Sequence, residues 1–331
     1  MKAIIPVAGA GTKLRPLTYT QPKPLIPVAG KPIISFIIDK LVSLQVEEFV
    51  FVLGYLGEKI SDYVEQRHPG LKKTFVHQDN RLGSGHAVWM ARDRVLPGDD
   101  LIIYFGDTIV DMDFQQMMSL PTSCLAIKKV QDPRNFGIVE FDEEGAVKRL
   151  VEKPKIPRSN MAMVGVYKIK EAGQLMAALD FNIQNDLRTG GEFPLTDGLM
   201  RMMDNGARCS TIEVENWYDC GKKESLLETN AILLDKAGYA SDNLPEYDNS
   251  IIIHPVSIGE DCRISNSVIG PHVTIGSHVA IESSIVKSSI IGNYASLHEV
   301  VLKQSVVGND TSITGFRQSL NIGDNTEIDF S

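Results

Sequence analysis

Glycines and cations near the start of the chain stand in a pattern that suits a polyphosphate. The apolar run 3–8 has the composition of a buried parallel strand. It breaks into a loop, 9–12, whose glycines would let backbone N–H groups approach an anion. Three cations follow shortly after, namely Lys13, Arg15 and Lys23. We predict a phosphate-binding loop made of Ala8, Gly9, Ala10, Gly11 and Thr12.

Two familiar phosphate loops do not fit this segment. The sequence has no GxxxxGK[ST] string after the strand, and Leu14 occupies the place of the third glycine in GxGxxG. The glycines alone would equally suit a strand-to-helix turn flanked by solvated lysines. The prediction therefore depends on what else in the chain could serve phosphate chemistry.

Carboxylates further along the chain could serve that chemistry. Asp107 follows the apolar run 101–105 in the string GDT, and Asp219 lies in NWYDCG. Two hard oxygen ligands suffice for Mg²⁺ when phosphates and waters complete the octahedron, although each aspartate alone fits a helix cap or a turn better. Glu152 and Lys153 could bind a sugar hydroxyl and a sugar phosphate, or form a surface ion pair.

Longer strings around these residues resemble one family. GAGTKLRPLT followed by PKPL is similar to the signature of sugar-1-phosphate nucleotidylyltransferases. VEKPKIPRSNMAMVGVY, GGEFPLTD, NWYDCG and IGDNTEI resemble the long form of glucose-1-phosphate thymidylyltransferase, which joins this catalytic domain to a C-terminal β-helix. LGSGHA also resembles uridylyltransferases that act on N-acetylglucosamine phosphate. The resemblance covers essentially the whole chain.

The resemblance implies an Mg²⁺-dependent reaction of an NTP, with dTTP or UTP favoured, and a sugar 1-phosphate, with glucose 1-phosphate favoured. The sugar-phosphate oxygen would attack the α-phosphorus and give a nucleotide sugar and pyrophosphate. Lys13 and Arg15 would meet the triphosphate, and Lys23 would bridge to the sugar phosphate. The implied metal ligands are Asp107 and Asp219, and the implied acceptor residues are Gly137, Glu152 and Lys153.

The resemblance also places the nucleobase. In the family, the segment that matches LGSGHA reads the base together with a glutamine, whose amide can donate and accept at once. The residues so implied are Gln78, Leu82, Gly83 and Ser84. His86 is expected to be a helix residue or a support of the base pocket, because the reaction needs no side-chain acid or base.

Two departures from the family pattern leave a second hypothesis open. Lys13 stands where the family carries an arginine, and lysine offers a point charge instead of the bidentate fork of arginine. Gly190 also stands where thymidylyltransferases carry an arginine, and Arg188 is near enough in sequence to replace it. The alternative is a nucleotide-sugar-binding regulatory homologue with impaired catalysis.

These residues need a scaffold that brings them to one edge of a sheet. Strand-like apolar runs alternate with amphipathic segments, which predicts a domain of the α/β class over 1–237, and the resemblance implies that it is a Rossmann-like nucleotidyltransferase domain. The spacing predicts a helix over 84–95, and short strands joined by turns over 123–168 make the sheet mixed. Ligands bind beyond the carboxyl ends of parallel strands, where 9–13 and 106–107 fall.

A second domain follows a turn-forming segment, 238–249, that we interpret as a linker. Over 250–331 apolar residues recur at intervals of five or six, often with glycine directly after. This period resembles the hexapeptide repeat of left-handed parallel β-helices, whereas a sandwich of short strands would need turn signals that are missing. Ser319–Phe330 is expected to cap the β-helix.

The predicted β-helix has two possible uses. Hexapeptide domains sometimes bind acyl-coenzyme A, and four histidines lie here, so a bifunctional uridylyltransferase and acyltransferase acting on an amino-sugar phosphate is an open alternative. The β-helix is short, which favours oligomerisation or allosteric packing and hence a homo-oligomer. The histidines are His254, His272, His278 and His298.

Composition narrows the partners. A net charge of −9 over 331 residues argues against nucleic acid. No apolar stretch reaches the length of a membrane span, and the first residues lack a signal-peptide core. The four cysteines are scattered without CxxC spacing, as expected for reduced thiols and not for a zinc site. We expect a cytoplasmic protein that binds small substrates and neither nucleic acid nor membrane.

Overall fold

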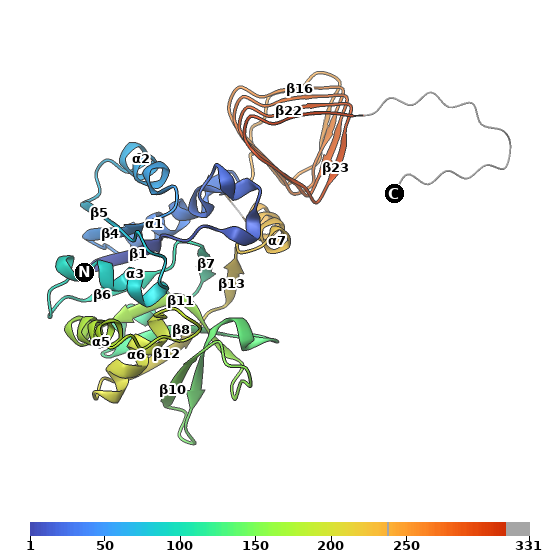
Figure 1. The fold of residues 1–331 in the computed structure, drawn as a ribbon. Coiled ribbons are helices and arrows are strands. Elements are labelled where there is room, and N and C mark those ends of the chain that lie inside the picture. Colours follow the sequence, from blue (N-terminus) through green and yellow to red (C-terminus); the bar gives the residue numbers. More distant parts are fainter. Residues whose placement is uncertain (237, 316–331) are drawn as a thin grey trace. The chain divides into compact units, whose positions relative to one another are not determined.

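The computed structural model describes residues 1–236 and 238–315, which fall into two compact units. The first unit spans 1–229, and the second begins at residue 230, inside α7 (Lys223–Asp235). Figure 1 shows a sheet flanked by helices in the first unit and a triangular stack of strands in the second. The predicted cap, Ser319–Phe330, lies outside the described residues.

A nine-stranded mixed sheet forms the centre of the first unit. Its path is β10-β9-β11-β6-β1-β4-β5, and β8 pairs with both β11 and β12. β1 runs parallel to β4 and β6, whereas β11 runs antiparallel to β6, β8 and β9. The predicted Rossmann-like mixed sheet is therefore confirmed. Its strands are β1 (Lys2–Val7), β4 (Glu48–Leu53), β5 (Lys73–His77), β6 (Leu101–Tyr104), β8 (Ser123–Lys129), β9 (Gly137–Phe141), β10 (Val147–Glu152), β11 (Met161–Ile169) and β12 (Cys209–Glu213).

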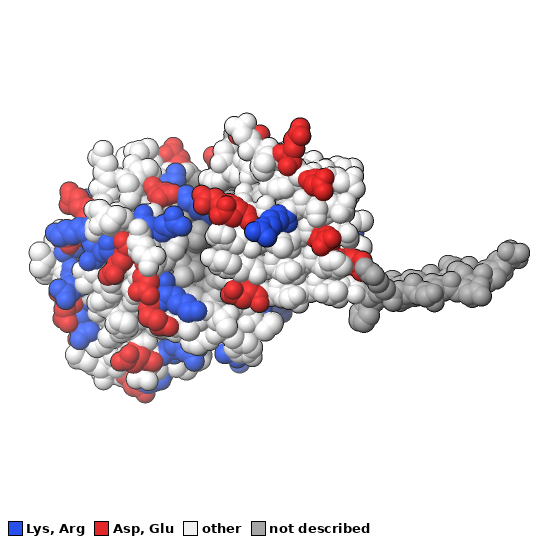
Figure 2. Space-filling model, turned by 90° about the horizontal axis from the view of Figure 1, so that it is seen from above, with Lys and Arg blue, Asp and Glu red and all other residues white. Residues whose placement is uncertain are grey.

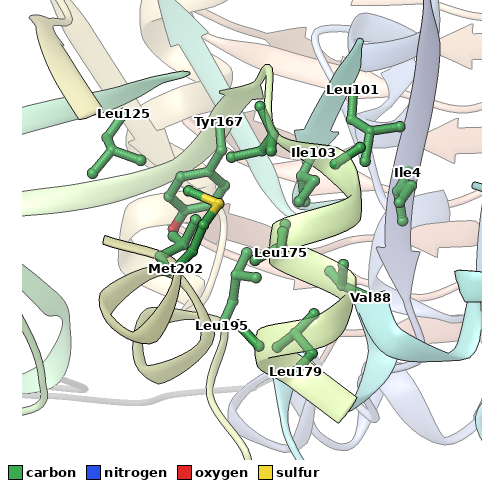
Figure 3. Packing of buried hydrophobic residues seen from close by; sticks show 14 of the residues in the cluster. Ile4, Val88, Leu101, Ile103, Leu125, Tyr167, Leu175, Leu179, Leu195 and Met202 are labelled. Carbon is green, nitrogen blue, oxygen red and sulfur yellow. The ribbon is translucent and has the colours of Figure 1, made fainter. Parts of the chain in front are cut away.

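Helices cover this sheet with apolar faces. α1 shows why such a segment forms a helix with one apolar face. Pro32 precedes it, and its buried residues recur at helical spacing. Leu175 and Leu179 of α5 pack with Leu195 of α6 in the core cluster that also includes sheet residues such as Ile4 (Figure 3). Besides α7, the helices are α1 (Ile33–Ser43), α2 (Gly57–Arg67), α3 (Ser84–Met90), α4 (Phe114–Ser119), α5 (Ala172–Gln184) and α6 (Leu195–Asp204).

Short elements complete the first unit, and one of them corrects a prediction. The helix predicted over 84–95 is wrong in length, because α3 ends at Met90 and a 3₁₀ turn, Arg92–Arg94, follows. The N–H of Ala91 already donates to Val88 O, three residues back, which tightens the chain. The small strands are β2 (Pro27–Val28), β3 (Lys31–Pro32), β7 (Thr108–Asp111) and β13 (Asn216–Asp219), of which β7 and β13 pair with each other.

The second unit is a prism of three parallel four-stranded sheets. Apolar residues one turn apart stack in register, as Ile264, Ile281 and Leu297 do. Within the described residues, every apolar position of the repeat from Ile258 to Ile313 is buried or packs against the core, so the left-handed β-helix is confirmed. The sheets are β14 (Ile251–Ile252), β17 (Val268–Ile269), β20 (Ile285–Lys287) and β23 (Val301–Lys303); β15 (Val256–Ile258), β18 (Val273–Ile275), β21 (Ile290–Ile291) and β24 (Val306–Val307); and β16 (Arg263–Ser265), β19 (Ala280–Glu282), β22 (Ser296–His298) and β25 (Ser312–Thr314).

Two of the four histidines lie at corners of the prism. His272 and His278 adopt left-handed backbone conformations there, with φ of 60° and 58°. His272 Nε2 lies 3.1 Å from Asp235 Oδ1, and the His278 ring stacks on Tyr294 at 4.8 Å. Each ring therefore serves a separate local contact. The segment 238–249 also packs here through apolar side chains, namely Leu244 and Tyr247.

Charged side chains of both signs lie on the surface. On the visible face of the first unit, basic and acidic side chains are interspersed and form no continuous basic area (Figure 2). Within the part of the chain that the structure describes, no helix combines the length and the apolar character that a membrane span requires.

Candidate active site

A cavity at the carboxyl ends of β1 and β6 collects most of the predicted nucleotide and metal residues. Its volume is about 410 Å³. The loops after β1, β6 and β13 line it, together with the start of α3. This is the edge of the sheet where the sequence placed the ligand. The predicted residues that line it are Ala8, Gly9, Gly11, Thr12, Lys13, Lys23, Gln78, Gly83, Ser84, Asp107 and Asp219.

An ion pair joins two of these residues. Lys23 is only 8% exposed, and its Nζ lies 2.7 Å from Asp107 Oδ2. Burial lowers the pKa of Lys23, but the carboxylates of Asp107 and Asp219 outweigh that effect and raise the pKa above its ordinary value. Burial raises the pKa of Asp107, and the ammonium of Lys23 more than offsets this. Both members of the pair are therefore charged at neutral pH.

Asp219 has the opposite pKa shift. Burial raises the pKa of its carboxyl group, the charge of Asp107 adds to this, and the ammonium groups of Lys23 and Lys13 offset only part of it. Burial thus makes the charged form of Asp219 poorly solvated in this cavity. A divalent cation would stabilise that form, and carboxylate oxygens are the ligands that Mg²⁺ prefers. Asp107 and Asp219 fit a metal whose other ligands are phosphate oxygens and waters.

Gly9 and Gly11 of the first loop differ in whether the fold itself requires glycine. Gly11 adopts φ +58°, and a Cβ there would lie 3.0 Å from Thr18 Cγ2. Thr18 Oγ1 also donates to Gly11 O at 2.9 Å, which holds the loop in place. Gly9 lies outside the left-handed region, and a Cβ there would meet no atom of the described chain within 4 Å. The fold does not require glycine at position 9, so the space beside it is available to a ligand.

Gln78 follows β5 and is 4% exposed at the cavity. Its Nε2 donates to Gly83 O at 3.1 Å and lies 2.9 Å from His86 Nδ1. Burial lowers the pKa of His86, and the charge of Arg92 adds to the effect. The imidazole is therefore neutral at pH 7 and can accept the second N–H of the amide. His86 supports Gln78 from within the protein.

The LGSG segment is bound to a second part of the chain. Gly85 N donates to Phe193 O at 2.8 Å, and Ser84 Oγ accepts from Leu195 N at 3.0 Å. A Cβ on Gly83 would lie 2.7 Å from Phe193 O, and one on Gly85 would lie 2.7 Å from Pro194 O. Both glycines are therefore required by close packing against the backbone of Phe193 and Pro194.

The predicted acceptor residues form a separate group. Thr196 Oγ1 donates to Glu152 Oε2 at 2.6 Å. A Cβ on Gly137 would lie 2.6 Å from Thr196 Oγ1 and 3.1 Å from Glu152 Oε2, so glycine leaves this carboxylate room. Lys153 Nζ lies 3.5 Å from Glu152 Oε1, and 57% of the Lys153 side chain is exposed. Gly137, Glu152 and Lys153 are brought together as predicted, but outside the described residues that line the cavity.

Three further predicted residues and the proposed substitute arginine also lie apart. Ala10, Arg15 and Leu82 are not among the described residues that line the cavity. The guanidinium of Arg15 lies over the Tyr19 ring, 5.1 Å from its centroid. Arg188 stacks on the Phe193 ring at 4.7 Å and donates from Nε to Asp186 Oδ1 at 2.6 Å. Arg188 is thus held by its own neighbours.

Sequence reasoning missed two residues of this region. Thr196 lies in GGEFPLTD, but no local pattern shows that it holds Glu152. Trp217 lies in NWYDCG, packs edge-on against Phe136 at 4.9 Å, and has a buried Nε1–H with no partner among the described residues. An unmet donor is costly in a folded protein, so a ligand atom is a reasonable partner for it. Phe136 directly precedes Gly137 in sequence. It therefore lies beside the acceptor group of Gly137, Glu152 and Lys153.

A protein family and several known proteins are similar to this chain. The sequence matches the family described as nucleotidyl transferase over residues 2–236. The chain belongs to this family. This nucleotidyl transferase is 31% identical to the glucose-1-phosphate thymidylyltransferase of Streptomyces griseus over 315 residues, which cover 88% of this chain and 87% of that relative. It is 37% identical to the bifunctional protein GlmU of Methanocaldococcus jannaschii over 238 residues, 71% of this chain and 55% of that protein.

A solved structure agrees with the sequence relatives of this nucleotidyl transferase. A crystal structure assigned to a glucose-1-phosphate thymidylyltransferase of Bacillus anthracis, in complex with sucrose, matches with a TM-score of 0.61 and 25% identity. The match covers 74% of this chain and 98% of the other. The predicted resemblance to this enzyme family is thereby confirmed, and so is the prediction of an enzyme.

Proposed function

We propose that the chain transfers a nucleotidyl group from dTTP or UTP to a sugar 1-phosphate, with glucose 1-phosphate favoured. A phosphate oxygen of the sugar 1-phosphate attacks the α-phosphorus, the bond to the β-phosphate oxygen breaks, and pyrophosphate leaves. The relatives named as thymidylyltransferases support this reaction. The observation that carries the proposal is one cavity that combines a ligand-accessible glycine loop with two lysines and two aspartates.

The triphosphate would lie along the loop after β1. Gly9 leaves space beside its backbone, and Lys13 and Lys23 bring positive charge to the same cavity. Placed cations lower the free energy of the transition state by meeting the charge that develops on the phosphates. We propose that Lys13 meets this charge and that Lys23 bridges to the acceptor phosphate. Arg15 would join only if it leaves the Tyr19 ring.

We propose that Asp107 and Asp219 hold a divalent cation, with Mg²⁺ favoured. When bound, the ion would offset phosphate charge and orient the phosphate oxygens. The aspartates themselves contribute a pair of hard oxygen ligands, and burial in the cavity disfavours the charged form of Asp219 as long as no cation is beside it. Titration with Mg²⁺, Mn²⁺ and Ca²⁺, followed by calorimetry with and without nucleotide, tests this part separately from turnover.

The base would be read by Gln78. Both N–H groups of its amide are used inside the protein, by Gly83 O and His86 Nδ1, so its carbonyl oxygen is what remains for a ligand. A carbonyl oxygen accepts the N3–H of uracil or thymine. The sugar would be held on the other side, with Glu152 accepting from a hydroxyl and Lys153 meeting the phosphate.

The test is a matrix of five NTPs against the 1-phosphates of glucose, mannose, galactose and glucosamine, read by pyrophosphate release with Mg²⁺. We expect the fastest release with dTTP or UTP and glucose 1-phosphate. No release from any pair would instead favour the regulatory homologue, for which tight nucleotide-sugar binding without turnover is expected. Lys13 and Gly190, each in place of a family arginine, are the residues that motivate this alternative.

We also propose a homo-oligomer that forms through the β-helix, in a cytoplasmic protein. Three apolar residues stack on the outer face of one sheet and are well exposed, namely Ile251 at 61%, Ile285 at 47% and Val301 at 75%. Contiguous exposed apolar residues favour association. Light scattering on the wild type and on a Val301→Lys variant tests the proposal, and a monomeric wild type at working concentration would reject it.

A further inference from the structure

His86 has a contact that the reaction itself does not need. Its Nδ1 lies 2.9 Å from Gln78 Nε2, and both side chains are almost fully buried. The ring also packs against Trp89, with centroids 5.6 Å apart, so α3 fixes its position. A residue held this firmly can in turn fix the orientation of the amide beside it.

The hydrogen-bonding partners allow only one orientation of the Gln78 amide. Gly83 O can only accept, so the group that faces it must be the NH₂ end of the amide. The neutral imidazole of His86 accepts the second N–H at Nδ1 when its own proton is on Nε2. A flipped amide would place Oε1 against both acceptors. Gln78 therefore offers the cavity an acceptor and no donor.

We propose that His86 is a positioning residue that sets the base specificity of this site by holding Gln78 in its acceptor orientation. The inference depends on the proposed function, in which Gln78 reads the base. Uracil and thymine carry a hydrogen on N3 and satisfy the Gln78 oxygen, whereas N3 of cytosine carries only a lone pair. Cytosine would need the flipped amide, which His86 and Gly83 O oppose.

The experiment measures kcat/KM for UTP, dTTP and CTP with saturating sugar 1-phosphate. His86→Phe keeps a ring for packing but removes the acceptor nitrogen. Because one hydrogen bond is worth about 0.5–1.5 kcal/mol, we expect the ratio of kcat/KM for UTP over CTP to fall about two- to thirteenfold. His86→Asn can present its amide oxygen in place of Nδ1, so it should restore most of the ratio.

A matched control and a double-mutant cycle separate positioning from general damage. His68→Phe removes a second histidine, which is only partly buried. Burial also lowers the pKa of His68, and its ring packs edge-on against Tyr63. It should leave the base ratio unchanged. In a Gln78→Ala background, His86→Phe should no longer alter the ratio, because the amide that it positions is gone.

The outcomes distinguish the inference from the function that it depends on. If the wild type releases pyrophosphate with a base preference and His86→Phe keeps that preference, the inference is wrong and the function stands. If the wild type turns over no NTP, the proposed function fails. If His86→Phe does not fold, equilibrium binding of UTP and CTP is measured for His86→Asn and His86→Ala instead. The same preference for UTP over CTP in these two variants would reject the inference.

Discussion

The nucleotide side and the acceptor side of the active site differ in how much is already in place without a substrate. The nucleotide side, which we define as 8–13, Lys23, Gln78, Asp107 and Asp219, joins residues from distant parts of the chain. Lys23 and Asp107 are 84 residues apart in sequence and pair at 2.7 Å. Lys23 and Gln78 are buried, and each is held by hydrogen bonds within the protein.

The acceptor side, which we define as Gly137, Glu152, Lys153 and Arg188, is organised differently. Thr196 holds Glu152, but the two cations pair with acidic residues one and two positions away in sequence. Lys153 is more than half exposed, and Arg188 is 38% exposed beside Asp186. Such pairs contribute little and are screened by salt. We propose a site that is preorganised for the nucleotide and completed by the sugar phosphate.

The largest effect should come from removing the charge at the centre of the nucleotide side. Asp107→Asn removes a proposed metal ligand and the partner of Lys23. Because losing one preorganised electrostatic contact costs about 100- to 1,000-fold in kcat, we expect a loss of at least about 100-fold. Pyrophosphate release at saturating substrates measures it. A loss of this size would also exclude the regulatory homologue.

The matched control is Asp113→Asn. Asp113 caps α4, where its Oδ1 accepts from Gln116 N at 2.8 Å, and asparagine also caps helices well. This variant should keep the wild-type rate. If Asp107→Asn kept more than a third of the activity, the nucleotide side would not be the preorganised half that the comparison describes.

A smaller effect should come from filling the space beside the first loop. In Gly9→Ala the new methyl group meets no protein atom within 4 Å, so thermal stability should not change. It would occupy the space proposed for the triphosphate, and we expect KM for the NTP to rise about tenfold, which corresponds to about 1.4 kcal/mol. Unchanged KM would show that the nucleotide does not approach this loop.

Gly54→Ala is the opposite case and serves as its control. A Cβ there would lie 2.7 Å from both Ala8 O and Ala8 Cβ, so the chain must shift to admit it. Overpacking of this kind costs about 1–3 kcal/mol of unfolding free energy. Urea unfolding should therefore show a loss for Gly54→Ala and none for Gly9→Ala.

The two sides also differ in how well the sequence predicts them. The glycine loop and its cations are contiguous, and the carboxyl ends of parallel strands are a general ligand position, so the nucleotide side could be found from local patterns. The hexapeptide period likewise predicted the β-helix, because one apolar residue per side must point inward. The pairing of Lys23 with Asp107 could not be predicted, since only the fold brings them together.

Other features depended on contacts that no local pattern contains. Gly83 in LGSG resembled a base-reading residue, but its glycine is also required by the carbonyl of Phe193. Arg15 stands among the cations of the first loop, yet its guanidinium lies over Tyr19. The role of Thr196 follows from a hydrogen bond to a residue 44 positions away. Tertiary contacts decide such cases, and a sequence reveals them only through family resemblance.

On the acceptor side, Thr196→Val should have a moderate effect. Glu152 would lose the hydroxyl that donates to it at 2.6 Å, while the side-chain shape is kept. A hydrogen bond to a charged group is worth about 1.5–3 kcal/mol, but Glu152 can recover part of this from water, so we expect KM for the sugar phosphate to rise about tenfold. KM for the NTP should not change.

Thr189→Val is the matched control for this variant. Thr189 Oγ1 donates to Asp197 Oδ2 at 2.7 Å, so the same substitution removes a similar hydroxyl-to-carboxylate bond that does not involve Glu152. It should leave both KM values near those of the wild type. Equal effects of the two variants would mean that Glu152 has no special place in sugar binding.

Arg188→Ala should have the smallest effect, and it tests whether the acceptor side has replaced the missing family arginine. The guanidinium stacks on Phe193 and bonds Asp186, so leaving these contacts for a sugar phosphate would forfeit both. We expect less than about a twofold change in KM for the sugar phosphate, the size expected of an exposed ion pair. A rise of tenfold or more, absent from an Arg134→Ala control whose ion pair with Asp132 is similarly local, would show that substrate binding moves Arg188 into the site. The acceptor side would then gain its arginine only once the sugar phosphate is bound.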